Sequence, residues 1–165
     1  YSLLNGGLHA WANEGHPLTD RPTVPRSSVY HAHLDPPSPA LATRDYILSH
    51  LEDPSVALLD ARSPEEYHGL KRYSARAGHI PGAVNMDWVN GMDQSRNLRL
   101  RDATALREEL KPLGVTPEKT VVTYCQTHHR SAYSYVMLKW LGFPNVKGYA
   151  GSWSEWGNRP DTPVE

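Results

Sequence analysis

The stretch "TVVTYCQTHHRSAYSYVMLKWLG", residues 120–142, contains the only cysteine of the 165-residue chain. Its first five residues, 120–124, are apolar and β-branched, which favours a strand in the centre of a sheet. Apolar side chains then recur at helical spacing, at Ala132, Val136 and Trp140. The helical pattern ends at Gly142. This order predicts that Cys125 lies in a loop between a central strand and a helix.

The same alternation of strands and helices continues through the rest of the chain. "VALLD", residues 56–60, predicts a buried strand, and "AGHIPGAVNM", residues 77–86, predicts a turn followed by a strand. Helices are indicated by a cap at Thr43, by a capping box from Ser63 to Glu66, and by Leu106, Leu110 and Leu113 before Gly114. These elements predict an α/β fold, with a mostly parallel sheet covered by helices on both faces. Active sites of such sheets lie beyond the carboxyl ends of the strands.

Length and composition limit the classes of function. A chain of 165 residues can form one domain with a substantial core, plus an appendage. Its 17 basic and 18 acidic residues nearly balance, so its net charge predicts no binding to nucleic acid or to an anionic membrane. It has no apolar run of membrane-spanning length and no basic-then-apolar signal segment at its start. The single cysteine excludes an internal disulfide framework, argues against a structural zinc site, and fits a cytoplasmic location.

A short internal repeat divides the chain. "NGGLHAW" at residue 5 aligns with "AGSWSEW" at residue 150, so that Trp11 coincides with Trp156. Because the offset is about one domain length, we expect residues 1–20 to be the C-terminal tail of a preceding, homologous domain. Residues 21–40 are rich in proline and have little periodicity, which predicts a linker. Residues 41–165 would then form one complete domain.

The predicted loop gives Cys125 a chemical environment. A connection from a strand to a helix points backbone N–H groups, and the positive end of the helix dipole, at its mouth. Such a field favours the thiolate, which is the nucleophilic form of cysteine. Arg130 adds positive potential, as do His128 and His129 when protonated. Two interpretations compete with a nucleophile: a buried structural cysteine, and a metal site shared with the histidines, which is disfavoured because adjacent histidines rarely point at one ion.

The spacing of the cysteine and the arginine separates two reactions of nucleophilic cysteines. Four residues lie between Cys125 and Arg130, one fewer than in the cysteine phosphatases, whose longer loop wraps a phosphate. The shorter loop suits an additional sulfur atom on Cys125. Sulfur transfer is therefore the favoured reaction. An arsenate reductase or dual-specificity phosphatase built on the same fold is the disfavoured alternative.

Four stretches resemble the rhodanese superfamily and occur in its order: "LLDARSPEEY", "GHIPGAVNM", the cysteine loop and "GYAGSWSEW", spanning about residues 56–156. The resemblance is to the catalytic C-terminal domain of tandem-domain thiosulfate sulfurtransferases. The loop "CQTHHRS" is similar to that of bacterial tandem rhodaneses of the Azotobacter type. This resemblance implies a rhodanese-like fold for residues 41–165. It also implies that residues 1–20 end the usually inactive first domain, against which the catalytic domain packs.

The resemblance further implies a reaction in two halves. Cys125 would take the outer sulfur of thiosulfate as a persulfide and pass it to cyanide, to thiols or to sulfur-carrying proteins, with no metal or organic cofactor. Arg62 would bind the sulfonate-like end of the donor. The other residues implied at the substrate are Gln126, Thr127, His128, His129 and Arg130. The competing interpretations are an ion-paired surface residue for Arg62 and, for Arg130, a tie between the loop and its own helix.

Two positions in the loop leave alternatives open, as does the class of protein. Thr127 stands where vertebrate relatives have lysine in the thiosulfate type and serine in the mercaptopyruvate type, so a 3-mercaptopyruvate sulfurtransferase is the nearest alternative. A non-catalytic rhodanese-type binding module is a further one. His128 stands where many family members have glycine, so the conformation of the loop is open. We expect Asp60 to form hydrogen bonds at the end of its strand, and Trp153 and Trp156 to pack in the core. The histidines of the tail and linker are expected to be solvated: His9, His16, His31 and His33.

Overall fold

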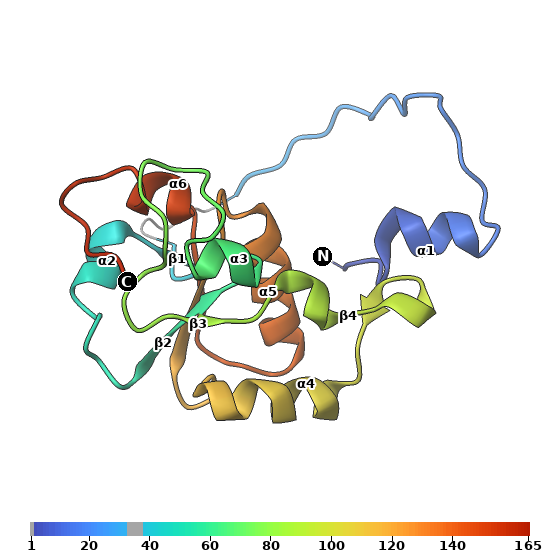
Figure 1. Cartoon of the computed structure of the whole chain (residues 1–165). Helices are drawn as coiled ribbons and strands as arrows, with labels where there is room; N and C mark the ends of the chain where they lie inside the picture. The colour runs from blue at the N-terminus through green and yellow to red at the C-terminus, as the bar shows by residue number, and fades with distance from the viewer. Residues whose placement is uncertain (1, 33–37) are drawn as a thin grey trace.

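The computed structural model describes residues 2–32 and 38–165 (Figure 1). At its centre is a five-stranded sheet in the order β1-β7-β6-β2-β3, in which every neighbouring pair is parallel. The strands are β1 (Leu41–Ala42), β2 (Val56–Asp60), β3 (Val84–Asn85), β6 (Thr120–Tyr124) and β7 (Val146–Tyr149). The predicted parallel sheet is confirmed. Its middle strand, β6, is the one that leads into Cys125.

Helices cover both faces of this sheet, as the sequence predicts (Figure 1). They are α2 (Arg44–Leu48), α3 (Pro64–Tyr67), α4 (Ala103–Leu110), α5 (His129–Trp140) and α6 (Ser152–Trp156). On one face, Leu106 of α4 and Met137 of α5 pack in one cluster with Leu59 and Val121 of the strands. This cluster is one of two apolar cores, whose burial drives the folding of a domain of this size.

The second core lies on the other face and contains the tryptophans of α6. Trp153 and Trp156 are 1% and 0% exposed, and they pack in one cluster with Ile47 of α2 and Val122 of β6. The packing role predicted for both tryptophans is confirmed. Because α6 follows β7 directly, this burial holds the start of α6 close to the carboxyl ends of the central strands.

The predicted helix boundaries at α3 and α4 are also confirmed. At α3, the Ser63 hydroxyl accepts a hydrogen bond from the Glu66 N–H and the Glu66 carboxylate accepts one from the Ser63 N–H, which completes the capping box. After α4, a 3₁₀ turn (Lys111–Leu113) ends at Gly114, whose φ of 72° is in the left-handed region.

The face that α5 turns to the core differs from the prediction. Ala132 is exposed and Trp140 is 51% exposed. The buried side chains are instead Ser131, Ser134, Met137 and Leu138. Serines can pack against the sheet here because they are small, and the Ser131 hydroxyl lies 2.7 Å from Nδ1 of His128. A search for apolar periodicity passes over such positions, and so the predicted stripe was wrong.

The first residues of the chain return to the domain through a helix, α1 (Gly7–Asn13). The helix lies beside a separate two-stranded antiparallel sheet, formed by β4 (Met92–Asp93) and β5 (Arg99–Leu100), as Figure 1 shows. Glu14, just after α1, forms a two-pronged ion pair with Arg99. The Asn5 side chain also accepts a hydrogen bond from the Leu100 N–H at 2.8 Å.

Residues 17–32 form neither helix nor strand and are exposed, in agreement with an extended linker. Three of the four tail and linker histidines, His9, His16 and His31, are exposed as predicted, whereas His33 lies outside the described residues. Residues 33–37 of the predicted linker are likewise outside them. Within residues 2–32 and 38–165, no helix is long and apolar enough to cross a membrane. No cluster of three metal-ligating side chains is found in the same part of the chain.

Candidate active site

Cys125 lies one residue beyond the end of β6, at the carboxyl edge of the sheet, as predicted. It is 1% exposed and its thiol is free. A loop of three residues, 126–128, separates it from the first residue of α5. The neighbouring strand β2 is in register, with Asp60 opposite Tyr124. Side chains that follow the ends of β2 and β6 therefore gather at the same edge.

The backbone on both sides of Cys125 is held by the start of α6. The Trp153 N–H donates to the Cys125 carbonyl and the Ser154 N–H donates to the Gln126 carbonyl, both at 2.9 Å. The Ser152 hydroxyl accepts a hydrogen bond from the Cys125 N–H at 3.3 Å. The two carbonyls are thus turned away from the mouth of the loop. The direction of the loop is set by a segment that follows it by about one strand and one helix.

The N–H groups of the loop remain available for an anion. In the part of the chain that the structure describes, the backbone N–H groups of residues 126–128 have no acceptor. The first N–H groups of α5 follow directly, and a helix of this length carries a partial positive charge at its N-terminus. The backbone therefore provides positive potential at the mouth without any lysine.

Arg130, in the first turn of α5, is the arginine that follows the loop. Its guanidinium forms a fork with Glu66, with Nη1 to Oε2 at 2.6 Å and Nη2 to Oε1 at 2.8 Å. Hydrogen bonds to Glu66 raise the pKa of Arg130 most, and the negative charges of Glu66 and of the Cys125 sulfur raise it further. Arg130 thus ties the start of α5 to α3, and not to its own helix. Arg130 therefore places a permanent positive charge near the Cys125 thiol.

His128 does not face the mouth of the loop. Its φ of 68° is left-handed, which explains why glycine suits this position. Its Nδ1 lies 2.7 Å from the Ser131 hydroxyl, and its ring covers Gly148 of β7, where a Cβ would come within 2.5 Å of the imidazole. Burial, and then the charge of His129, lower the pKa of His128, so the ring is neutral at pH 7. The predicted substrate contact and positive charge at His128 conflict with this geometry.

Thr127 and His129 are the exposed side chains of the loop. The Thr127 hydroxyl and Nδ1 of His129 lie 3.4 Å apart. Both side chains can therefore reach a molecule that approaches from solvent. Gln126 is half-buried, and its amide nitrogen donates to the Ser74 hydroxyl at 3.1 Å. Gln126 thus connects the loop to the segment after α3.

Arg62 is buried below the loop. Its side chain is 2% exposed and forms an ion pair with Asp60, with Nη2 to Oδ2 at 2.6 Å and two contacts from Nε. Nη2 also donates to the Gly78 carbonyl, and the guanidinium lies 4.6 Å from the centre of a Trp153 ring. Burial alone would lower the pKa of Arg62, but the hydrogen bonds and charge of Asp60 outweigh it, and the pKa is raised.

Nε and Nη2 of Arg62 are already bound to Asp60, so this arrangement does not support the predicted contact between Arg62 and the donor, which stays a prediction. The competing interpretation predicted an ion pair at the surface. Arg62 does form an ion pair, with Asp60, but the pair is buried. The ring contact places Arg62 between the end of β2 and α6. It therefore supports the same α6 segment that holds the Cys125 backbone. The predicted hydrogen-bonding role of Asp60 at the strand end is seen directly.

The sequence did not reveal the roles of two residues at this site, Glu66 and Ser152. Glu66 was recognised only as a helix cap, although the same carboxylate also binds Arg130. Ser152 was seen only as part of a motif. Neither role carries a local signal, because each joins segments more than 25 residues apart in the sequence. A polar side chain fully buried beside a strand end is recognisable only after the strands have been assembled.

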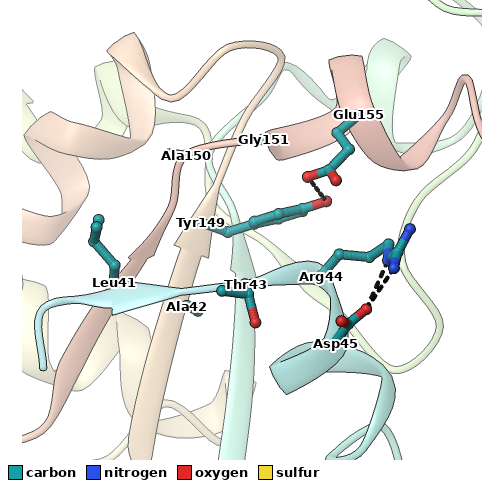
Figure 2. A pocket seen from close by; sticks show the side chains of 9 residues that line it. All are labelled: Leu41, Ala42, Thr43, Arg44, Asp45, Tyr149, Ala150, Gly151 and Glu155. Carbon is teal, nitrogen blue, oxygen red and sulfur yellow. Dashed lines mark hydrogen bonds and ion pairs between the residues drawn. The ribbon is translucent and has the colours of Figure 1, made fainter. Parts of the chain in front are cut away.

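Two surface pockets lie away from Cys125. The larger, of about 350 Å³, is at the carboxyl ends of β1 and β7, and Figure 2 shows the side chains that line it. Its polar groups are paired with one another: the Tyr149 hydroxyl donates to Glu155 at 2.8 Å, and Arg44 binds Asp45. The smaller, of about 280 Å³, is lined by Thr120 at the start of β6. Neither pocket includes the Cys125 loop.

A family model described as a rhodanese-like domain matches residues 43–159. The chain belongs to the rhodanese-like domain family. The match covers the strands from β2 to β7, together with the Cys125 loop and α6. The predicted family and fold are thereby confirmed.

Curated relatives of this rhodanese-like chain include two bacterial enzymes named thiosulfate sulfurtransferase, from Azotobacter vinelandii and Pseudomonas aeruginosa. Each is 52% identical over 166 residues, which cover 100% of this chain and 59% of the relative. A protein from Thermus thermophilus named sulfur carrier protein TtuD is 38% identical, with 98% of this chain and 60% of the relative covered. The chain thus spans about three fifths of the length of the relatives it matches.

Solved structures give the same fold. The anaerobic ergothioneine biosynthesis enzyme from Chlorobium limicola, in complex with trimethyl histidine, superposes with a TM-score of 0.87 at 27% identity. The match covers 98% of this chain and 40% of that one. A structure of EanB in a cysteine persulfide state with ergothioneine matches with the same TM-score at 26% identity.

The Glu66–Arg130 fork predicts a pH-dependent stability. Burial raises the pKa of Glu66, but hydrogen bonds from Arg130 outweigh it, so the pKa lies below its ordinary value of 4.5. The pair therefore stabilises the fold above pH 4.5, and this contribution is lost as the pH falls through the lower folded value. For Glu66→Gln we expect the free energy of unfolding at pH 7 to fall by about 1–3 kcal/mol, with the deficit shrinking in acid.

Urea denaturation at several pH values measures this deficit. Glu108→Gln, at an exposed carboxylate on α4, is the matched control and should differ little from the wild type. A Glu66→Gln deficit that stays constant from neutral pH into strong acid would show that the charge of Glu66 does not stabilise the fold.

The buried Arg62–Asp60 pair predicts a larger loss of stability. Asp60→Ala leaves a guanidinium without a counter-charge at a site where both side chains are at most 2% exposed. Breaking a buried pair in this way should lower the free energy of unfolding by about 3–5 kcal/mol. Asp45→Ala breaks the Arg44–Asp45 pair, whose carboxylate is 76% exposed, and should cost less than about 1 kcal/mol. Equal losses in the two variants would contradict the structural role assigned to Arg62.

Proposed function

We propose that the protein is a thiosulfate:cyanide sulfurtransferase that carries sulfane sulfur as a persulfide on Cys125. The observation that supports this most strongly is the position of Cys125 after the central strand, in a loop whose carbonyls are bound by α6 and whose N–H groups are free. The names of the two relatives at 52% identity agree with this activity. Because the chain spans 59% of the length of these relatives, their activity enters here only as part of this proposal.

The reaction consists of two displacements at sulfur. In the first, the Cys125 thiolate attacks the outer sulfur of thiosulfate, the bond between the two sulfur atoms of thiosulfate breaks, and sulfite leaves with the bonding electron pair. Cys125 then carries a persulfide whose terminal sulfur is anionic. In the second, cyanide attacks that terminal sulfur, thiocyanate leaves, and the Cys125 thiolate is restored. No net oxidation occurs, so neither step requires a redox partner.

The loop provides for the charges of both steps. The N–H groups of residues 126–128 and the first turn of α5 stabilise the thiolate and the persulfide anion. Arg130 offsets the charge of the sulfur, although Glu66 neutralises part of its effect. Thr127 and His129, as the exposed groups, contact the sulfonate-like end of the donor. Gln126 orients the loop through Ser74.

The acceptors follow from the chemistry of a persulfide. Its terminal sulfur is taken by thiophiles, so cyanide, small thiols and sulfur-carrying proteins are the expected acceptors. The relative named sulfur carrier protein agrees with transfer to another protein. We further propose that residues 1–20 end a preceding inactive rhodanese-like domain against which this domain packs, and that the protein acts in the cytoplasm, where a lone thiol stays reduced.

The hydroxyl of Thr127 supports one competing donor. Mercaptopyruvate carries a carboxylate and a carbonyl, and an exposed hydroxyl at the mouth could bind either group. Initial rates with the two donors at equal concentrations, with cyanide as acceptor, separate the alternatives. We expect a higher kcat/KM for thiosulfate than for mercaptopyruvate. The reverse order would make the protein a 3-mercaptopyruvate sulfurtransferase.

Thiocyanate formation from thiosulfate and cyanide tests the function itself. The two displacements predict ping-pong kinetics, with parallel lines in double-reciprocal plots. Cys125→Ala should lose all turnover while unfolding at a temperature close to that of the wild type. Ser134→Ala, which changes another buried side chain at the helix that follows, should retain turnover. Thiocyanate production by Cys125→Ala would contradict the proposal.

A further inference from the structure

The connection from β7 to α6 contains a left-handed backbone conformation at a residue that is not glycine. Ser152, the first residue of α6, has a φ of 50° and is 0% exposed. A left-handed conformation is unfavourable for a residue that has a Cβ, and glycine usually takes such positions. Where a non-glycine residue keeps it, the surroundings must hold it there. Here the side chain of Ser152 itself provides the reason.

The Ser152 hydroxyl joins two strand ends. It donates a hydrogen bond to the Tyr149 carbonyl at 2.8 Å and accepts one from the Cys125 N–H at 3.3 Å. The first bond fixes the hydroxyl to the end of β7, and the second fixes the Cys125 peptide to the hydroxyl. Only a side chain with both a donor and an acceptor can make this pair of contacts, because the carbonyl needs a donor and the N–H needs an acceptor.

The rest of the turn keeps Ser152 in place. Figure 2 shows β7 leading through Ala150 and Gly151 into α6, with Glu155 reaching back to the Tyr149 hydroxyl. A Cβ at Gly151 would come within 2 Å of the Glu155 carboxylate, so no side chain fits there. Trp153, the next residue, is buried in the core. The turn therefore cannot rotate without losing either the core packing or the Glu155 contact.

We propose that Ser152 is a positioning residue for Cys125. Its hydroxyl binds the Cys125 N–H and so fixes the peptide between Tyr124 and Cys125. With that peptide fixed, the N–H groups of residues 126–128 stay directed at the sulfur. This proposal rests on the persulfide function of Cys125. Because the Trp153 N–H donates to the Cys125 carbonyl, both the N–H and the carbonyl of Cys125 are held by α6. Without the hydroxyl, the Cys125 N–H loses its partner, and the peptide is free to turn.

Two substitutions separate the hydroxyl from the backbone conformation. Ser152→Ala removes the hydroxyl and keeps the unfavourable φ, whereas Ser152→Gly removes the hydroxyl and relieves it. We expect Ser152→Gly to unfold at a higher temperature than Ser152→Ala. We nevertheless expect both to react more slowly at Cys125. A residue important only for stability would give rates that follow the unfolding temperatures.

Two rates of Cys125 measure the effect. The first is alkylation by iodoacetamide, and the second is the gain of sulfur from thiosulfate, both followed by intact mass. We expect each variant to show a fall of about three- to tenfold in the alkylation rate and in the maximal rate of sulfur gain, as for the loss of one hydrogen bond. The thiosulfate concentration that gives half the maximal rate should not change, because Ser152 does not touch the donor.

Ser134→Ala is the matched control, since it removes the hydroxyl of a serine that is 2% exposed on α5 and leaves the Cys125 peptide bound. Its rates should equal those of the wild type. A Ser152→Gly variant that reacts at the wild-type rate would overturn the proposal, whatever Ser152→Ala does, and so would an equal slowing by Ser134→Ala. If the wild type gains no sulfur, the proposed function fails, while the alkylation rates still decide the role of Ser152.

Discussion

The hydrogen bonds from the start of α6 to the Cys125 and Gln126 carbonyls determine how this loop can act. A loop between a strand and a helix exposes both donors and acceptors, and an anionic sulfur is stabilised only by the donors. By binding the two carbonyls at 2.9 Å, α6 removes the acceptors from the mouth of the loop. These contacts require α6 to sit close to the end of β6. That position depends in turn on the burial of Trp153 and Trp156 against the sheet.

Two arginines that look equivalent in the sequence have different tasks. Arg62 is neutralised by Asp60 and contacts the Trp153 ring, so it helps to hold α6 at the end of β2. Arg130 is also paired, with Glu66, but its side chain is 27% exposed and it interacts with the Cys125 sulfur. The difference arises from burial. A guanidinium that is fully enclosed needs a counter-charge to remain in the fold, whereas one at the edge can share its charge between a carboxylate and a reacting group.

Much of the fold was predictable because it depends on local patterns. The β-branched run of residues 120–124, the capping box at α3 and the left-handed Gly114 are determined by their own neighbourhoods, and each was found as predicted. The buried face of α5 was not, because Ser131 and Ser134 are small polar residues that apolar periodicity does not include. The partners of Arg130 and Ser152, and the contact of Arg62 with Trp153, could not be predicted either, since they depend on which strand ends become neighbours. Cys125 was identifiable from its position in the chain, but the residues that hold it were not.

The central claim is that Cys125 carries the transferred sulfur, and intact-protein mass measures this most directly. The mass is recorded before thiosulfate, after thiosulfate and after subsequent cyanide, with Cys125→Ala treated in parallel. A persulfide on Cys125 predicts a gain of one sulfur atom that cyanide removes and that the variant does not show. No gain in the wild type, or the same gain in the variant, would contradict it.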